Sequence, residues 1–360
     1  MERQVYRDVI LNRLKRLDIE WFLHKAYVYV FLMIEKHLGT GFAPAPLACG
    51  LVVTENCNMR CPMCVLPQRY LNNPNNCDTQ TWKRVIDELH ELGMGGIAIS
   101  GGEPTLRQDI SDLLDHARGN NTVVTLNSNM TALGAGRIEK LMRAAPDNIS
   151  VSIDSGNEEI NDCLRGGKDV LRRVMEGIRA LDQARKAHGV KTTISVVATL
   201  SDLNLEDLDV LFAKAKESGA DRISFLPLHD IKDGRTYVVT QPKARPDLYD
   251  VLAELSAKHN LPLENSRRYL KGFYNVMSGG LPKERCNVGY THLIIGADLT
   301  IYRCTPFMNM GMPILRWDPT QTRLKDLWNS PVWRKDRLAA LECKQCYWNC
   351  HAEINGLIPM

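Results

Sequence analysis

Three cysteines lie close together near the start of the chain, in the segment Cys57-Asn58-Met59-Arg60-Cys61-Pro62-Met63-Cys64. The segment follows a short apolar run at residues 51–53 that is typical of a β-strand. Closed zinc sites and fully ligated iron–sulfur clusters take four protein ligands. Three thiolates would therefore leave one iron of a [4Fe–4S] cluster open to a ligand that the protein does not supply.

A second group of chemically active residues follows the next apolar run, at residues 97–100. The sequence there is Gly101-Gly102-Glu103-Pro104. Glycines allow the backbone to approach a ligand closely, and a carboxylate can accept hydrogen bonds from an ammonium group. The order of the two groups predicts that Glu103 faces the same site as the cysteines.

The C-terminal part of the chain carries a third group. It consists of five cysteines: Cys286, Cys304, Cys343, Cys346 and Cys350. Five thiolates are enough for a second cluster with one to spare. A structural zinc site with His351 as a ligand is the alternative.

Alternating strands and helices must position these residues. Apolar runs predict strands at residues 51–54, 97–100, 123–126, 149–153, 193–199 and 223–226. Helical spacing predicts helices at residues 80–92, 109–117, 170–181 and 205–217. Such repeats indicate an α/β fold with a parallel sheet, and in barrels of this kind the chemistry lies at the carboxyl ends of the strands. The cysteine loop follows the first strand, as this rule requires.

The cysteine spacing and the Gly-Gly-Glu-Pro segment resemble the signature of the radical S-adenosylmethionine (radical SAM) superfamily. The resemblance implies a partial (β/α)6 TIM-type barrel and a [4Fe–4S] cluster on Cys57, Cys61 and Cys64. In this family the open iron binds S-adenosylmethionine, which is cleaved reductively to a 5′-deoxyadenosyl radical. Gly101, Gly102 and Glu103 would then hold the amino group of that cofactor.

Further segments resemble cofactor-binding elements of the same family. Val151-Ser152-Ile153-Asp154 is similar to its Ser-x-Asp element, and the segment 161–166 is similar to one whose arginine neutralises the cofactor carboxylate. The resemblance implies cofactor contacts from Met63, Ser128, Ser152, Asp154, Arg165 and Leu226. After Ser128 the family often has a glycine where this chain has Met130.

The C-terminal cysteines resemble the SPASM/twitch extension of radical SAM enzymes, in which a hairpin and a terminal cysteine group bind auxiliary iron–sulfur clusters. The resemblance implies one auxiliary [4Fe–4S] cluster on Cys286, Cys304, Cys343 and Cys346, with Cys350 as a substitute ligand. A small α+β cysteine-rich domain is expected there, with a hairpin at 293–302. Leu299 stands where the family usually has a glycine.

We expect an N-terminal helical segment (1–47), the barrel (48–228), a helical connector (229–285) and the auxiliary cluster domain (286–360). Residues 229–241 are expected to form a loop. The longest apolar run, residues 26–34, is too short to cross a bilayer. Peripheral membrane contact is a less favoured alternative to helix packing.

Composition restricts the partners. The net charge of +3, from 45 basic and 42 acidic residues, gives no nucleic-acid footprint. Eleven cysteines without a secretory leader argue against a disulfide framework and favour the cytoplasm. The resemblance implies an electron donor such as flavodoxin or ferredoxin.

The expected function is oxidation of a small organic, natural-product or sugar-like substrate after hydrogen abstraction. The alternatives are an epimerase with Cys163 or Cys77 as hydrogen donor, a peptide-crosslinking or peptide-modifying enzyme, and a lipid-modifying enzyme. His229 is expected to position the substrate, since it follows the sixth strand. A metal-cluster scaffold that binds partners is the non-enzymatic alternative.

Overall fold

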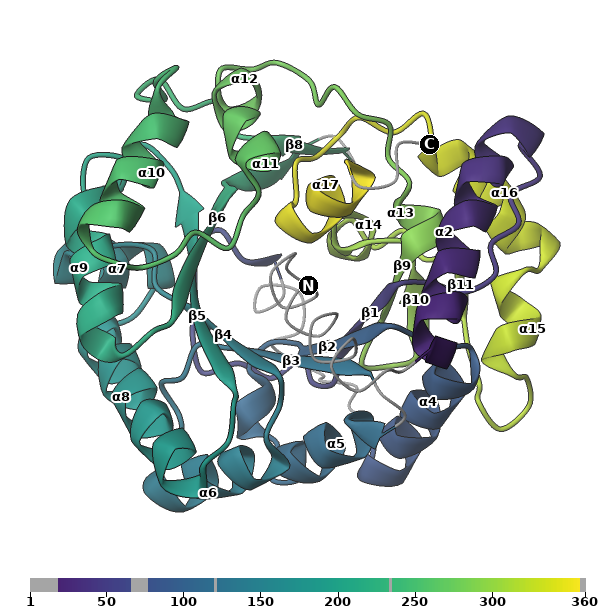
Figure 1. Ribbon diagram of the computed structural model, residues 1–360, viewed down its shortest axis with the longest axis horizontal. Helices are drawn as coiled ribbons and strands as arrows, with labels where there is room; N and C mark the ends of the chain where they lie inside the picture. Colours follow the sequence, from purple (N-terminus) through teal and green to yellow (C-terminus); the bar gives the residue numbers. More distant parts are fainter. Residues whose placement is uncertain (1–18, 66–76, 120–121, 233–234, 357–360) are drawn as a thin grey trace.

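A computed structural model describes residues 19–65, 77–119, 122–232 and 235–356. Most strands of this described part form one nine-stranded sheet (Figure 1). Its centre consists of parallel neighbours in chain order: β1 (Ala48–Val52), β2 (Gly96–Ser100), β3 (Val123–Ser128), β4 (Asn148–Ser152), β5 (Thr193–Leu200) and β6 (Arg222–Pro227). The expected partial (β/α)6 barrel is confirmed.

Helices cover the outside of this curved sheet (Figure 1). They are α4 (Thr79–Glu91), α5 (Ile110–Ala117), α6 (Ala135–Ala144), α7 (Glu158–Arg165), α8 (Val170–His188) and α9 (Leu208–Ser218). In α4 the apolar residues Trp82, Val85, Ile86 and Leu89 are buried, since their spacing places them on one face. α6 and α7 are short and polar, so they were not predicted from the sequence.

The C-terminal hairpin continues the same sheet. β9 (His292–Ile295) pairs in parallel with β1, and β10 (Thr300–Tyr302) pairs antiparallel with β9 and with β11 (Leu315–Arg316). The predicted hairpin at 293–302 is confirmed. Because β9 lies beside β1, the C-terminal region adjoins the strand that leads into the cysteine loop.

The segment after β6 differs from the expectation. Residues 229–241 were expected to form a loop, which is wrong: β7 (His229–Lys232) and β8 (Arg235–Val238) form a two-stranded antiparallel sheet. Charged residues in both strands hide the apolar alternation that marks a strand. The helices that follow are α10 (Leu248–Lys258), α11 (Arg267–Lys271) and α12 (Phe273–Met277).

The remaining helices lie at the two ends of the chain. They are α2 (Ile19–Leu38), α13 (Val288–Thr291), α14 (Thr305–Asn309), α15 (Leu324–Trp328), α16 (Pro331–Ala340) and α17 (Asn349–Asn355). The first residues of the expected N-terminal helical segment lie outside the described residues. Of the described helices, none is both long and apolar enough to cross a membrane. The domain boundaries stay predictions.

The buried guanidinium of Arg337 ties the two ends of the chain together. Its Nη1 donates to the carbonyl of Gly41, just after α2, and its Nε donates to the carbonyl of Gly289 in α13. Its Nη2 donates to the carbonyl of Trp328, whose ring it also covers at 4.0 Å. The segment after α2 is thereby fixed against the C-terminal region.

Candidate active site

The cysteine loop lies at the carboxyl end of β1, between the neighbouring strands β2 and β9. The carboxyl ends of parallel strands meet at one face of the barrel, so the loops after β2, β3 and β4 also converge there. The first three predicted ligands, Cys57, Cys61 and Cys64, are all partly exposed. None of the eleven cysteines forms a disulfide.

Gly101 and Gly102 bring the loop after β2 against the cysteine loop. A Cβ at Gly101 would lie 2.3 Å from the carbonyl oxygen of Thr54, and one at Gly102 would lie 2.3 Å from that of Asn56. The N–H of Gly102 donates to the Thr54 carbonyl at 2.9 Å. The predicted close approach at these glycines is therefore made, among the described residues, to the backbone that precedes Cys57.

The end of α7 holds the cysteine loop from another side. Gly166 adopts a left-handed φ of +60°, and a Cβ there would lie 2.1 Å from the carbonyl oxygen of Arg60. The thiol of Cys61 donates to the carbonyl of Arg165 at 3.3 Å. The main chain around the second cysteine is therefore fixed by contacts that only glycine permits.

Arg107 ties together the two ends of the segment that carries the three cysteines. Its Nη1 donates to the carbonyls of Val53 and Cys77, both at 3.0 Å, while its Nε and Nη2 donate to the carboxylate of Asp109. Burial by itself raises the pKa of Asp109, but hydrogen bonds from Arg107 and Thr79 outweigh burial and lower it. The sequence analysis did not identify Arg107, which we infer to be a positioning residue.

Glu103 lies fully buried within a hydrogen-bond network. Its Oε1 accepts from the hydroxyl of Ser128 at 2.7 Å and from the N–H and hydroxyl of Thr105, and its Oε2 accepts from the N–H of Asn129 at 2.7 Å. Two predicted cofactor-binding residues, Glu103 and Ser128, are thus brought into direct contact. Because carboxylate oxygens have several lone pairs, Oε2 retains the capacity to accept a further donor.

Asp154 and Arg165 form an ion pair below the cysteine loop. Nε of Arg165 lies 2.7 Å from Oδ2 of Asp154, at angles outside those of a hydrogen bond. Oδ1 of Asp154 accepts from the N–H of Thr199. Burial raises the pKa of Asp154 more than Arg165 lowers it. Asp154 is fully buried, so in this arrangement its carboxylate links β4, α7 and β5.

The other predicted cofactor contacts are spread over the same end of the barrel. Ser152 ends β4 and Leu226 lies in β6, and both are partly exposed, as is Met63. Met130 is buried and adopts a left-handed φ of 53°. Cys163 is exposed on α7. The structure thus joins Glu103 to Ser128 and Asp154 to Arg165, whereas their contacts with a cofactor stay predictions.

The thiols of Cys57, Cys61 and Cys64 form a donor set that suits a positively charged centre. Burial, together with the negative charges of Glu103, Cys61 and Cys64, raises the pKa of Cys57 to about 11. Burial also raises the pKa of Cys61, which Arg165 partly offsets. Thiolates are the species that bind metals, so bound cations would supply the charge that this site lacks. The donor set fits an iron–sulfur cluster.

The C-terminal cysteines lie within electrostatic reach of one another. Cys286 donates a hydrogen bond to Cys343, which lowers the pKa of Cys343 to about 6 and raises that of Cys286. Burial, together with the neighbouring thiols of Cys343 and Cys350, raises the pKa of Cys346 to about 12. Cys304 is buried, and burial raises its pKa too, with contributions from Cys346 and Cys343. These distant sequence positions therefore form one thiol group.

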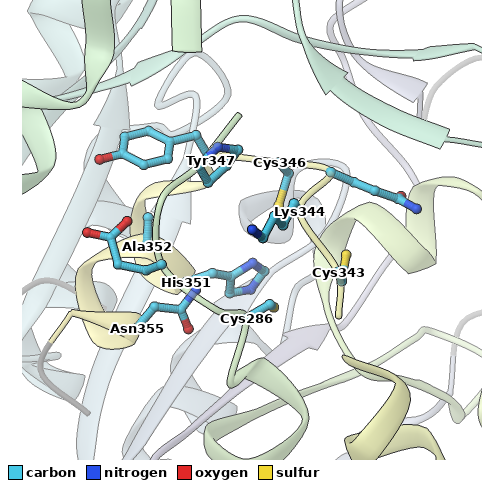
Figure 2. Close-up of a pocket in the computed structure, with 11 residues that line it drawn as sticks. Cys286, Cys343, Lys344, Cys346, Tyr347, His351, Ala352 and Asn355 are labelled. Atoms are coloured by element: carbon cyan, nitrogen blue, oxygen red, sulfur yellow. The ribbon is translucent and has the colours of Figure 1, made fainter. Parts of the chain in front are cut away.

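A small pocket of about 20 Å³ opens beside this group (Figure 2). Cys286, Cys343, Cys346 and His351 are among the residues that line it. The N-terminal half of α17 carries His351, and burial lowers the pKa of this imidazole to about 3. Among the described residues, no three His, Cys, Asp or Glu side chains converge closely enough to hold a single metal ion.

His229 lies against the C-terminal cysteine loop. Its Nε2 accepts a hydrogen bond of 3.0 Å from the N–H of Tyr347, and its ring lies 4.8 Å from that of Trp348. Burial lowers the pKa of His229 to about 4. Its expected role in positioning the substrate stays a prediction.

Comparison with known proteins gives several matches. Residues 51–225 match the family model described as the radical SAM superfamily. The chain is 31% identical over 180 residues to PqqA peptide cyclase of Ruegeria pomeroyi, which covers 50% of this chain and 46% of the relative. It is 27% identical over 245 residues to that of Bradyrhizobium diazoefficiens, which covers 68% and 61%.

A third relative is named as a heme synthase and not as a peptide cyclase. The AdoMet-dependent heme synthase of Methanosarcina barkeri is 32% identical over 176 residues, which cover 49% of each chain. The chain thus spans between 46% and 61% of the length of these three relatives.

Among solved structures, Streptococcus suis SuiB bound to its precursor peptide SuiA has a TM-score of 0.65 at 18% identity, covering 85% of this chain and 70% of SuiB. This likeness shows the fold. The match at residues 51–225 begins in β1 and ends in β6, so it includes the cysteine loop and every barrel strand that positions it. Residues 51–225 of the chain therefore form a radical SAM domain, and the C-terminal cysteine-rich region fits the SPASM/twitch type.

Proposed function

We propose that this radical SAM enzyme modifies a peptide substrate. The observation that carries the proposal is the similarity to two PqqA peptide cyclases, of which one match covers 68% of this chain. The relatives therefore favour peptide modification, an alternative in the sequence analysis, over the expected oxidation of a small organic molecule. Cys163 is exposed on α7, so it is not a buried hydrogen donor of the kind that the epimerase alternative would use.

Cys57, Cys61 and Cys64 would hold the [4Fe–4S] cluster that the family implies. With S-adenosylmethionine bound, such a cluster supplies the electron that starts radical chemistry. Glu103 would accept from the ammonium group of S-adenosylmethionine through Oε2, while Ser128 and Thr105 orient the carboxylate through Oε1. These residues bind and orient, and the barrel wall keeps water from the reacting atoms.

Joining two positions of a peptide removes two hydrogen atoms. The first leaves with the deoxyadenosyl group, and the second leaves as a proton and an electron. A one-electron acceptor is therefore required, and the C-terminal thiol group is the donor set that would hold one. The electron donor, a flavodoxin or a ferredoxin, is part of the proposal.

The test is anaerobic incubation with dithionite and S-adenosylmethionine, followed by chromatography for 5′-deoxyadenosine. We expect the wild type to form it and Cys61→Ala to form none. Cys49→Ala is the matched control, because Cys49 is buried in β1 and precedes the cluster loop. Absence of 5′-deoxyadenosine from the wild type would refute the enzymatic assignment.

The substrate class is tested by adding the short peptides encoded beside the gene. The expected result is a peptide lighter by two hydrogen atoms, with fragmentation that places the new bond. A tetrapyrrole is the second candidate, because the heme synthase has a similar identity to this chain. Decarboxylation or oxidation of an added porphyrin precursor, with every peptide unchanged, would favour that candidate instead.

A further inference from the structure

His351 is a buried polar residue of the pocket beside the C-terminal thiol group. It is 3% exposed, and its Nε2 has no hydrogen-bond partner among the residues that the structure describes. Burial of an imidazole nitrogen without a hydrogen-bond partner carries a free-energy cost, because the nitrogen loses its hydrogen bond to water. A fold that retains this cost indicates a partner at that nitrogen.

The position of the ring suggests which partner it is. Figure 2 shows the imidazole of His351 directed into the space between Cys286 and Cys346, with Cys343 at the side. These three thiols and His351 line the same pocket, whereas Cys304 and Cys350 are not among its lining residues. Imidazole nitrogen replaces thiolate as an iron ligand in some iron–sulfur clusters.

We propose that His351 ligates the auxiliary cluster through Nε2, together with Cys286, Cys343 and Cys346. This inference rests on the proposed assignment of the C-terminal thiols to an iron–sulfur cluster, and it is independent of the substrate. It replaces Cys304 of the expected ligand set with a neutral nitrogen. The cluster then carries one negative charge fewer, which raises its reduction potential.

A neighbouring histidine provides a matched control. His292 begins β9, is 4% exposed and also has an Nε2 without a hydrogen-bond partner. Its ring packs edge-on against His351 with centroids 5.3 Å apart, and Thr291 contacts its Nδ1. His292 does not line the pocket. If both histidines were only buried side chains, substitution of either one should affect the auxiliary cluster to a similar degree. If His351 is a ligand, only its substitution should change the cluster.

The experiment uses the full chain with Cys57→Ala, Cys61→Ala and Cys64→Ala, so that any remaining iron belongs to the auxiliary site. Pulsed electron paramagnetic resonance of the reduced protein should show coupling to a directly bound nitrogen. Labelling with ¹⁵N-histidine should change that coupling. The coupling should disappear in His351→Ala and persist in His292→Gln.

A second variant covers the case in which His351→Ala fails to fold. His351→Cys supplies a thiolate at the same position, so it should retain iron, lose the nitrogen coupling and have a lower reduction potential. Cys304→Ser should keep both iron and coupling. A reduced cluster without histidine coupling would overturn the inference, as would zinc or no metal at this site. The proposed function is tested separately, by formation of 5′-deoxyadenosine with a chain that keeps Cys57, Cys61 and Cys64.

Discussion

The main-chain N–H of Tyr347 donates a hydrogen bond of 3.0 Å to Nε2 of His229. His229 begins β7, one residue after β6 has ended, and Tyr347 directly follows Cys346. The barrel and the C-terminal cysteine loop are thus joined by one side chain, across 118 positions of the sequence.

Replacement of His229 should loosen the C-terminal cysteine loop. His229→Ala leaves the buried N–H of Tyr347 without an acceptor, which costs about 1–3 kcal/mol. We expect less iron at the auxiliary site and unchanged iron at Cys57, Cys61 and Cys64. Iron per chain, measured after anaerobic purification with and without the three N-terminal cysteines, separates the two sites.

His259→Ala is the control for this prediction. The ring of His259 stacks on Phe212 and its Nε2 contacts Asp209, in the α9 and α10 layer outside the sheet. Like His229, His259 makes one ring contact and one polar contact, but it lies away from the cysteine loops. Equal iron content in His229→Ala and His259→Ala would contradict a linking role for His229.

Arg107 should control how firmly the first cluster is held. Arg107→Lys retains the charge but cannot donate simultaneously to Val53, Cys77 and Asp109, because an ammonium lacks the planar fork of a guanidinium. Each lost charge-assisted hydrogen bond costs about 1.5–3 kcal/mol. We expect faster loss of iron to a chelator from Cys57, Cys61 and Cys64, followed by absorbance.

The control for Arg107 is Arg118→Lys. Arg118 also donates through Nη1 to a main-chain carbonyl, that of Ala144 at the end of α6, away from the cysteine loop. Its substitution removes a comparable bond. Identical rates of iron loss in the two variants would exclude a specific tether by Arg107.

Much of the fold could be predicted from the sequence, because β1 to β6 are short apolar runs that recur between helical segments. The cysteine spacing likewise predicted two groups of neighbouring thiols, whereas their roles as metal ligands stay predictions. Arg107 could not be found in this way, since its partners at Val53 and Cys77 are main-chain carbonyls that any residue carries. The contact of His229 with Tyr347 depends on how β7 meets the loop before α17, and no local pattern encodes that.

Gly166 should be necessary for cluster assembly. Gly166→Ala places a Cβ about where the Arg60 carbonyl oxygen lies and also forces alanine into a left-handed conformation, which costs about 1–2 kcal/mol. We expect the cysteine loop to shift and the iron at Cys57, Cys61 and Cys64 to fall. Electron paramagnetic resonance of the reduced cluster should lose intensity in parallel.

Gly189→Ala is a matched control, because Gly189 ends α8 with a φ of +63° and a Cβ there would meet nothing within 4 Å. It carries the same left-handed cost without the steric contact. Both variants should lose similar thermal stability from strain, but only Gly166→Ala should lose iron. Comparable iron loss in both would attribute the effect to strain alone.

Met130 and Leu299 stand at the two positions where the family resemblance led us to expect glycine, and both adopt left-handed backbone conformations, with φ of 53° and 65°. This is the backbone conformation that glycine adopts most easily. Both side chains are buried, so their packing offsets a strain of about 1–2 kcal/mol in each case.

Substitutions at Met130 can separate strain from packing. Met130→Gly and Met130→Ala both remove a buried side chain, which costs about 2–5 kcal/mol, so both should unfold at lower temperature than the wild type. Glycine relieves the left-handed strain and alanine does not, although the greater chain entropy of unfolded glycine offsets about 0.4–1 kcal/mol of that relief. The glycine variant should therefore be the more stable of the two in anaerobic thermal unfolding. If the alanine variant were more stable, the left-handed conformation at position 130 would not be a source of strain.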